Sequence, residues 1–129
     1  MLQILDTTVL IDYLRGRPAV SRVQALLERD ITPATTVINV EEIVRGLREA
    51  ERGAAETLID GLVVLPITTQ DAWLAGRWRR DYASRGRTLW QADCLIAAVC
   101  VRAGAPLATS NPKDFPMTEI EVSHWPVGH

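Results

Sequence analysis

The stretch WQADCLIAAVCV, residues 90–101, places one acidic residue, Asp93, ahead of eight consecutive apolar or small residues. A helix of this composition has no polar face, so we expect it to be buried on most sides. Gly104 is typical of a helix C-terminus, residues 106–109 have the composition of a short buried strand, and residues 110–115 are polar. Helix, strand and polar loop in this order predict one half of a βαβ-type unit, whose loop can face the same cleft as Asp93.

Asp93 has two interpretations at this stage. As an N-terminal carboxylate it would satisfy free backbone N–H groups and the helix dipole. Alternatively, it is a carboxylate held on a rigid element at the edge of a cleft, ready to bind a metal ion. The residue by itself favours neither.

The N-terminus repeats the pattern of an acidic residue at the end of a buried element. Residues 2–5 form a short apolar run that stops at Asp6, and apolar residues then recur at helical spacing until Gly16. Asp6 therefore lies at the carboxyl end of a predicted strand, which is the side where open α/β sheets bind ligands. The structural alternative is that Asp6 or Thr7 only caps the following helix.

The remaining chain predicts alternating helices and strands, and hence an α/β layered domain with a mainly parallel sheet. Pro33 favours an edge or end position for its strand, and Val40, Ile43, Val44 and Leu47 form the core stripe of the helix that contains them. We expect helices over residues 18–29, 39–52, 54–62 and 69–84, strands over 31–37, 63–67 and 119–122, and a tail from 125 to 129.

Length and composition restrict the class of protein. The 129 residues predict a single domain over 1–129, and no apolar run reaches membrane-spanning length. The start of the chain lacks the basic segment of a secretory signal, so we expect a cytoplasmic protein. The net charge of −2 argues against nucleic-acid binding by bulk positive charge, although Arg77, Arg79, Arg80, Arg85 and Arg87 crowd one stretch.

Two cysteines and two histidines offer no metal-binding pattern. Cys94 and Cys100 are six residues apart on one predicted helix, without the paired neighbours of a zinc site, so we expect small core residues. His124 and His129 lie near the C-terminus, where neither is placed to act as a ligand.

Carboxylates from distant parts of the chain are expected to converge. Parallel strands bring Asp6, Asp93 and the loop from Asn111 to Asp114 to one edge of the sheet, and Glu42 comes from an intervening helix. Clustered carboxylates repel one another, and a hard divalent cation such as Mg²⁺ or Mn²⁺ removes that penalty. Periodicity alone places Glu42 away from its helix's core stripe and does not show that it faces the cleft.

Four segments in order resemble the motifs of PIN-domain ribonucleases, and more closely those of the VapC toxins of bacterial toxin–antitoxin pairs: ILDTTVLIDYLRG at 4–16, VEEIVRG at 40–46, ADCLIAA at 92–98 and LATSNPKDF at 107–115. The resemblance implies a three-layer α/β/α sandwich and an endoribonuclease that depends on Mg²⁺, with Mn²⁺ as substitute. It also implies a homodimer and a VapB antitoxin whose C-terminal segment occupies the active-site groove.

The same resemblance assigns site residues. The catalytic, metal-binding acids fall on Asp6, Glu42 and Asp93, and Glu42 is chosen over Glu41 because the family places a glycine, here Gly46, four residues after it. The fourth position is often acidic but appears here as Asn111, so that Asp114 is either a substitute ligand or a structural residue. Thr8 and Thr109 match hydroxyl positions near the metal, and we expect Arg45 and Arg80 to contact RNA phosphates.

Three other functions use similar residues. A receiver-like signalling domain also has an acidic pocket at strand ends, but it gives Glu42 no role. A phosphomonoester hydrolase with Asp6 as nucleophile needs a carboxylate at position 8, where this chain has Thr8. A non-catalytic PIN-like interaction module is the third alternative, since a missing fourth acid would weaken metal binding.

Overall fold

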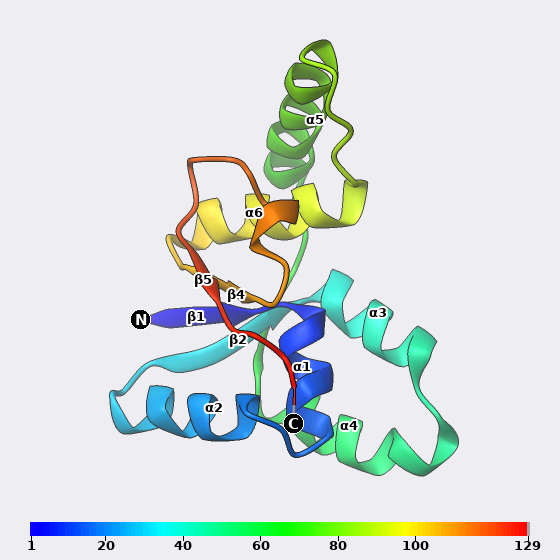
Figure 1. Ribbon diagram of the computed structural model, residues 1–129, viewed down its shortest axis with the longest axis vertical. Helices are drawn as coiled ribbons and strands as arrows, with labels where there is room; N and C mark the ends of the chain where they lie inside the picture. The colour runs from blue at the N-terminus through cyan, green and yellow to red at the C-terminus, as the bar shows by residue number, and fades with distance from the viewer. Residues whose placement is uncertain (129) are drawn as a thin grey trace.

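The centre of the structure is a sheet of five parallel strands (Figure 1). A computed structural model describes residues 1–128, and His129 lies outside the described residues. The strand order is β3-β2-β1-β4-β5, and each adjacent pair is parallel. The strands are β1 (Leu2–Leu5), β2 (Thr32–Thr36), β3 (Val63–Leu65), β4 (Leu107–Thr109) and β5 (Val122–His124).

Helices cover both faces of this sheet, with α5 and α6 above it and α1, α2 and α4 below it in Figure 1. The described helices are α1 (Thr7–Leu14), α2 (Ala19–Glu28), α3 (Val37–Gly46), α4 (Arg52–Asp60), α5 (Thr69–Ser84) and α6 (Gln91–Ala103), with short 3₁₀ turns η1 (Glu49–Glu51) and η2 (Pro112–Asp114). Each face buries its own apolar cluster, one under α5 and α6 and one under α1, α2 and α4. The expected three-layer α/β/α sandwich is therefore confirmed.

Helix α6 is buried as its composition predicts. Cys94 and the residues from Ile96 to Cys100 are at most 1% exposed, and Gly104 ends the helix with a left-handed φ of 62°. Cys94 and Cys100 are both free thiols in the core, and burial raises their pKa values to about 11 and about 12. Their prediction as small core residues is confirmed.

The single helix expected over residues 39–52 is wrong. Helix α3 stops at Gly46, and Leu47 takes an extended backbone before η1 and α4 begin. Glycine lowers helix stability at this point, and Leu47 packs against the lower apolar cluster. Because α3 is short and lies at the edge of the layer, Val44 is 56% exposed and does not belong to the core stripe.

The C-terminal segment also differs from expectation. The last strand is β5, not residues 119–122, because Val122 pairs with Leu107 in the parallel register and the residues before it form a turn. His124 thus ends β5 and is exposed, while Gly128 donates its backbone N–H to the buried Asp12 over 3.2 Å. The tail therefore lies against α1.

Pro33 lies near the start of β2, which is an interior strand. It pairs with Gln3 of β1, whereas the pairing with β3 begins one residue later at Ala34. The missing N–H of proline therefore falls outside the β3 ladder. Of the two positions expected for Pro33, the strand end is correct and the sheet edge is wrong.

None of the helices formed by residues 1–128 is both long enough and apolar enough to cross a membrane.

Candidate active site

Asp6 is the first residue after β1 and the most buried acid of the site, with 7% of its surface exposed. It occupies the N-cap position of α1, but its side chain makes no cap hydrogen bond. Instead, Oδ2 accepts a hydrogen bond from Thr109 Oγ1 at 2.7 Å, and Oδ1 accepts one from Asn39 Nδ2 at 3.3 Å. The Asp6 carboxylate is therefore held by side chains of β4 and α3 in addition to the backbone of Thr7 at the start of α1.

The pKa of Asp6 is raised above its ordinary value. Burial is the largest cause, because it disfavours the charged form. Hydrogen bonds from Thr109, from the Thr7 backbone and from Asn39 act in the opposite direction, and the negative charge of Glu42 adds to the increase. A positive charge nearby would therefore stabilise the ionised form of Asp6.

Asn39 is a site residue that the sequence analysis missed. It is fully buried, and its Nδ2 donates both to Asp6 and to Thr7 Oγ1, the latter at 2.9 Å. Its Oδ1 accepts from the Thr36 hydroxyl at 2.8 Å, as part of a reciprocal N-terminal cap of α3. A Thr followed three residues later by a polar amide was the signal that could have identified it.

Thr7 links the end of β1 to Glu42. Thr7 Oγ1 donates a hydrogen bond to Glu42 Oε1 at 2.6 Å, so the half-buried Glu42 is turned toward the carboxyl end of the sheet. The charge of Glu42 raises the pKa values of both Asp6 and Asp93. Glu41, by contrast, is exposed. Glu42 is therefore the glutamate that joins the acidic cluster.

Asp93 lies in the first turn of α6 and completes the convergence of acids. Its pKa is raised to about 7 by burial and by the negative charges of Asp6, Asp114 and Glu42, in that order. In contrast with Asp6, no hydrogen bond within the described residues offsets this increase. The negative charges of Asp6, Glu42 and Asp114 therefore all act on Asp93, and these four acids are called the acidic cluster below.

The loop after β4 closes this cluster. Thr109 is buried against Asp6, and the Ser110 N–H donates to Thr8 Oγ1 at 3.2 Å, which fixes the loop to α1. Asn111 donates its backbone N–H to Thr109 Oγ1 at 3.1 Å and is itself exposed, whereas Asp114 is half-buried. Of the two candidates for the fourth position, Asp114 is the one whose charge acts on Asp93.

Basic residues lie outside the cluster. Arg45 and Arg80 are exposed on α3 and α5, and within residues 1–128 neither forms an ion pair with the four clustered acids. A cavity of about 340 Å³ opens beside Thr8 and Asn111, and Arg15 and Arg17 also line it. Arg15 and Arg17 thus lie beside Thr8 and the loop after β4.

The donor set suits a hard divalent cation. All the donors are carboxylate oxygens, and their mutual repulsion, visible in the raised pKa values of Asp6 and Asp93, would be relieved by a doubly charged ion. Within residues 1–128, no three Asp, Glu, His or Cys side chains form a ready-made metal cage. Mg²⁺ needs no such cage, because it usually keeps several waters and takes only one or two carboxylates.

Comparisons with known proteins agree with this geometry. The profile of the PIN domain family matches residues 4–120. Ribonuclease VapC19 of Mycobacterium tuberculosis is 34% identical over 117 residues, which cover 90% of this chain and 94% of that protein.

Solved structures show the same architecture. The structure of DNA-bound VapBC from Salmonella typhimurium aligns with a TM-score of 0.82 and 25% identity over 97% of this chain and 99% of that chain. VapBC2 from Rickettsia felis, bound to a DNA fragment from their promoter, aligns with a TM-score of 0.85 over the same shares, and at 20% identity it supports the fold alone. The chain therefore belongs to the PIN domain family and, within it, to the VapC ribonucleases.

Proposed function

We propose that this chain is the toxin of a toxin–antitoxin pair and hydrolyses RNA phosphodiester bonds endonucleolytically with the help of a divalent metal ion. The observation that carries the proposal is the convergence of four acids at the carboxyl edge of the sheet, with the pKa of Asp93 raised to about 7 by burial and by its neighbours. Relatives at 34% identity are named ribonucleases, and metal dependence is general among the ribonucleases of this family.

Asp6 and Asp93 are the principal metal ligands in this proposal, and Mg²⁺ is the proposed ion, with Mn²⁺ as substitute. When bound, the ion would lower the pKa of a water molecule and stabilise the charge that develops on the phosphate. Asp114 fills the fourth acidic position in place of Asn111, because its charge acts on Asp93. All-oxygen ligation favours these ions over zinc.

The remaining residues of the cluster position these ligands. Thr109 and Asn39 hold one oxygen each of Asp6, which fixes the plane of the carboxylate. Thr7 occupies one oxygen of Glu42, and we assign to Glu42 the orientation of the attacking water and the acceptance of its proton. Thr8 keeps the loop after β4 closed over the site through Ser110.

RNA would reach the acidic centre across the basic residues around it. Arg45 and Arg80 remain proposed phosphate contacts, and Arg15 and Arg17 join them because they line the cavity beside Thr8. A substrate phosphate cannot approach four carboxylates unless cations compensate their charge. Bordering arginines and the metal ion together supply that compensation.

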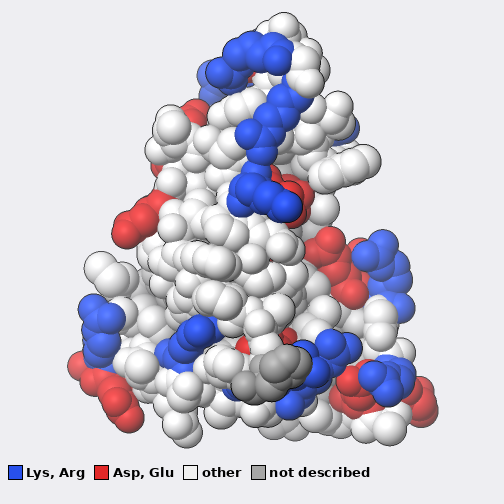
Figure 2. All heavy atoms as spheres, in the orientation of Figure 1, with Lys and Arg blue, Asp and Glu red and all other residues white. Residues whose placement is uncertain are grey.

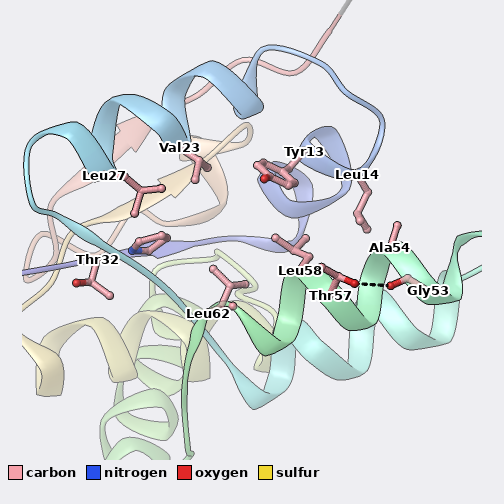
Figure 3. Close-up of a pocket in the computed structure, with 12 residues that line it drawn as sticks. Tyr13, Leu14, Val23, Leu27, Thr32, Gly53, Ala54, Thr57, Leu58 and Leu62 are labelled. Atoms are coloured by element: carbon pink, nitrogen blue, oxygen red, sulfur yellow. Dashed lines mark hydrogen bonds between the residues drawn. The ribbon is translucent and has the colours of Figure 1, made fainter.

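The antitoxin has a separate candidate docking site in an apolar groove of about 600 Å³ between α1, α2 and α4 (Figure 3). Tyr13, Val23 and Leu58 point into it, and Leu27 at its rim is 56% exposed. An apolar surface of this size suits the apolar face of a partner helix. The neighbouring solved structures are toxin–antitoxin complexes, so we assign the groove to the antitoxin, with its C-terminal segment continuing into the active site.

We also propose that residues 1–129 act as one domain, that the protein forms a homodimer, and that it acts in the cytoplasm, where its RNA substrate is found. Light scattering of the purified protein tests the homodimer directly.

The test of the activity is cleavage of a mixed-sequence single-stranded RNA in Mg²⁺, with excess EDTA as the metal-free control. We expect Asp6→Asn and Asp93→Asn to lose cleavage while keeping the wild-type circular dichroism spectrum. Glu42→Gln should lose activity, and Glu41→Gln, at an exposed position, should keep it. Because both variants lose one negative charge, a difference between them shows that the position of Glu42 in the site matters and not the net charge of the surface.

Retained cleavage in well-folded Asp6→Asn and Asp93→Asn variants would refute the assignment. If the purified wild-type protein cleaves no RNA in Mg²⁺ or Mn²⁺, the alternative of a non-catalytic PIN-like interaction module replaces the enzyme.

A further inference from the structure

Trp90 is the N-cap residue of α6, and 69% of its surface is exposed. A tryptophan is rarely left so open to water. Its carbonyl oxygen accepts the N–H of Cys94 at 3.1 Å, which anchors its backbone to the rigid start of α6, while its side chain makes no cap hydrogen bond. Trp78, in contrast, is buried and donates its indole N–H to Glu119 at 2.7 Å. The backbone of Trp90 is therefore anchored, while its side chain is exposed and is not part of the core.

The position of Trp90 relative to Asp93 is set by the helix. Trp90, whose backbone is extended, is the N-cap and Asp93 the third residue of α6, so the two residues lie at the same end of this helix. An exposed indole thus stands beside the acid whose pKa responds to all the others of the cluster. A molecule bound at the acidic centre would meet it.

Basic side chains flank the same rim. Arg87, three residues before Trp90, donates from Nη2 to the carbonyl oxygen of Lys113 at 2.5 Å, and this bond ties the segment before α6 to the loop that carries Asp114. Arg87 and Lys113 are both exposed. On the face shown in Figure 2, lysine and arginine side chains run from the tip of α5 down toward α6. Positive charge on this rim complements a polyanion.

We propose that Trp90 is a stacking platform for one base of the single-stranded RNA next to the scissile phosphate, and that it acts as a substrate-positioning residue. The proposal rests on the ribonuclease function proposed above. Aromatic side chains stack on any base, and each stacked base contributes to the affinity of single-stranded nucleic acid. Arg87 and Lys113 contact neighbouring phosphates without reading sequence. By stacking on one base, Trp90 therefore determines which phosphate of a single-stranded RNA is held at the acidic cluster.

Trp73 provides a matched control. It is 73% exposed, in nearly the same degree as Trp90, but it lies at the start of α5. There Asp71 forms an ion pair of 3.0 Å with Arg102, and Arg102 follows Asp93 by nine residues in α6, a distance of about 13 Å along the helix axis. Replacement of Trp73 therefore removes a similarly exposed indole from α5, near the end of α6 that is opposite to Asp93.

The experiment measures kcat and KM for Mg²⁺-dependent cleavage of a mixed-sequence, 20-nucleotide single-stranded RNA. We expect Trp90→Ala to raise KM roughly 5- to 150-fold, the range for the loss of one stacked base, with a smaller change in kcat. Trp90→Phe should recover most of this loss. Trp73 lines one cavity with Arg80, a proposed phosphate contact, but lies away from Asp93, so Trp73→Ala should raise KM far less than Trp90→Ala. After the cut is mapped, an RNA abasic at the adjacent nucleotide should lose affinity for the wild type and none further for Trp90→Ala.

Each other outcome overturns a defined part of the proposal. Equal KM values for Trp90→Ala, Trp73→Ala and the wild type would show that Trp90 does not contact the substrate. A Trp90→Ala protein that dissociates into monomers by light scattering would assign the indole to a subunit contact instead. A wild type that cleaves no RNA would refute the proposed function, and with it the role of Trp90.

Discussion

Thr7 Oγ1 donates a 2.6 Å hydrogen bond to Glu42 Oε1 and accepts one from Asn39 Nδ2 at 2.9 Å. The single proton of the hydroxyl is directed to the glutamate because the amide of Asn39 occupies its acceptor side. Asn39 also donates to Asp6. One hydrogen-bond network therefore holds Asp6, at the end of β1, and Glu42, on α3, in fixed positions relative to each other.

Replacement of Thr7 should therefore impair catalysis through Glu42. We expect Thr7→Val to lower kcat about 10- to 100-fold, the usual cost of losing a residue that orients a site ligand. Thr7→Ser keeps the hydroxyl and should retain most of the activity. Equal rates for the valine and serine variants would show that the Thr7–Glu42 bond does not serve the reaction.

The pKa of Asp93 makes the stability of the metal-free protein dependent on pH. The carboxyl group of Asp93 keeps its proton up to about pH 7 in the folded state, whereas in the unfolded state it loses the proton near pH 3.8. The folded protein therefore loses stability as the pH rises between these two values, and it loses no further stability above them. Asn cannot ionise, so the melting temperature of Asp93→Asn in EDTA should exceed that of the wild type by a margin that widens from pH 4 to pH 7.

Two comparisons test this explanation. Asp60→Asn, which removes an exposed carboxylate of α4, should not reproduce the widening margin. Addition of Mg²⁺ or Mn²⁺ at pH 8 should raise the melting temperature of the wild type more than that of Asp93→Asn, because a bound cation relieves the same repulsion. A margin independent of pH would contradict the raised pKa.

Arg102 should support folding through Asp71, which is only 1% exposed. Burial by itself would raise the pKa of Asp71, but hydrogen bonds from Arg102 and from Thr68 lower it below its ordinary value. The ionised pair therefore stabilises the fold above pH 3.8 and is lost as pH falls through the lowered pKa.

We expect Arg102→Met to lower the free energy of unfolding at pH 7 by about 1–3 kcal/mol, because it leaves a buried carboxylate with fewer partners. Urea titration at pH 7 and pH 3 measures the effect, which should shrink at the lower pH. Arg102→Lys keeps the positive charge but loses the forked set of N–H donors. Its free energy of unfolding should lie between those of the wild type and Arg102→Met. An equal loss at both pH values would exclude the ion pair as its cause.

The apolar groove should be needed for inhibition by the antitoxin and not for catalysis. Leu27→Glu places a charge at the exposed rim of the groove and should weaken inhibition by the antitoxin roughly 10- to 150-fold, the equivalent of one leucine left unburied. RNA cleavage without antitoxin should be unchanged. Val44 is also 56% exposed but lies outside the groove, so Val44→Glu is the control variant. If the antitoxin inhibits Leu27→Glu and Val44→Glu equally well, it binds elsewhere on the protein.

Local patterns were enough to predict most elements and two of the acids. The apolar run that predicts α6 and the abrupt end of β1 at Asp6 depend only on neighbouring residues, and both predictions agree with the structure. Gly46 and Leu47 show where this reasoning failed: the helical pattern continues past them, but the packing of Leu47 against a cluster formed by distant residues ends the helix.

By itself, the sequence determined the layered α/β class, the buried α6 and the placement of Asp6 and Asp93 at the ends of core elements, because each follows from periodicity within a few residues. Only the tertiary structure decided that Glu42 turns toward the site, that Asn39 and Thr7 hold it there, and that the charge of Asp114 reaches Asp93. Those outcomes depend on hydrogen bonds and charge interactions between residues more than 20 positions apart in the chain, and no local pattern encodes the distance between such groups.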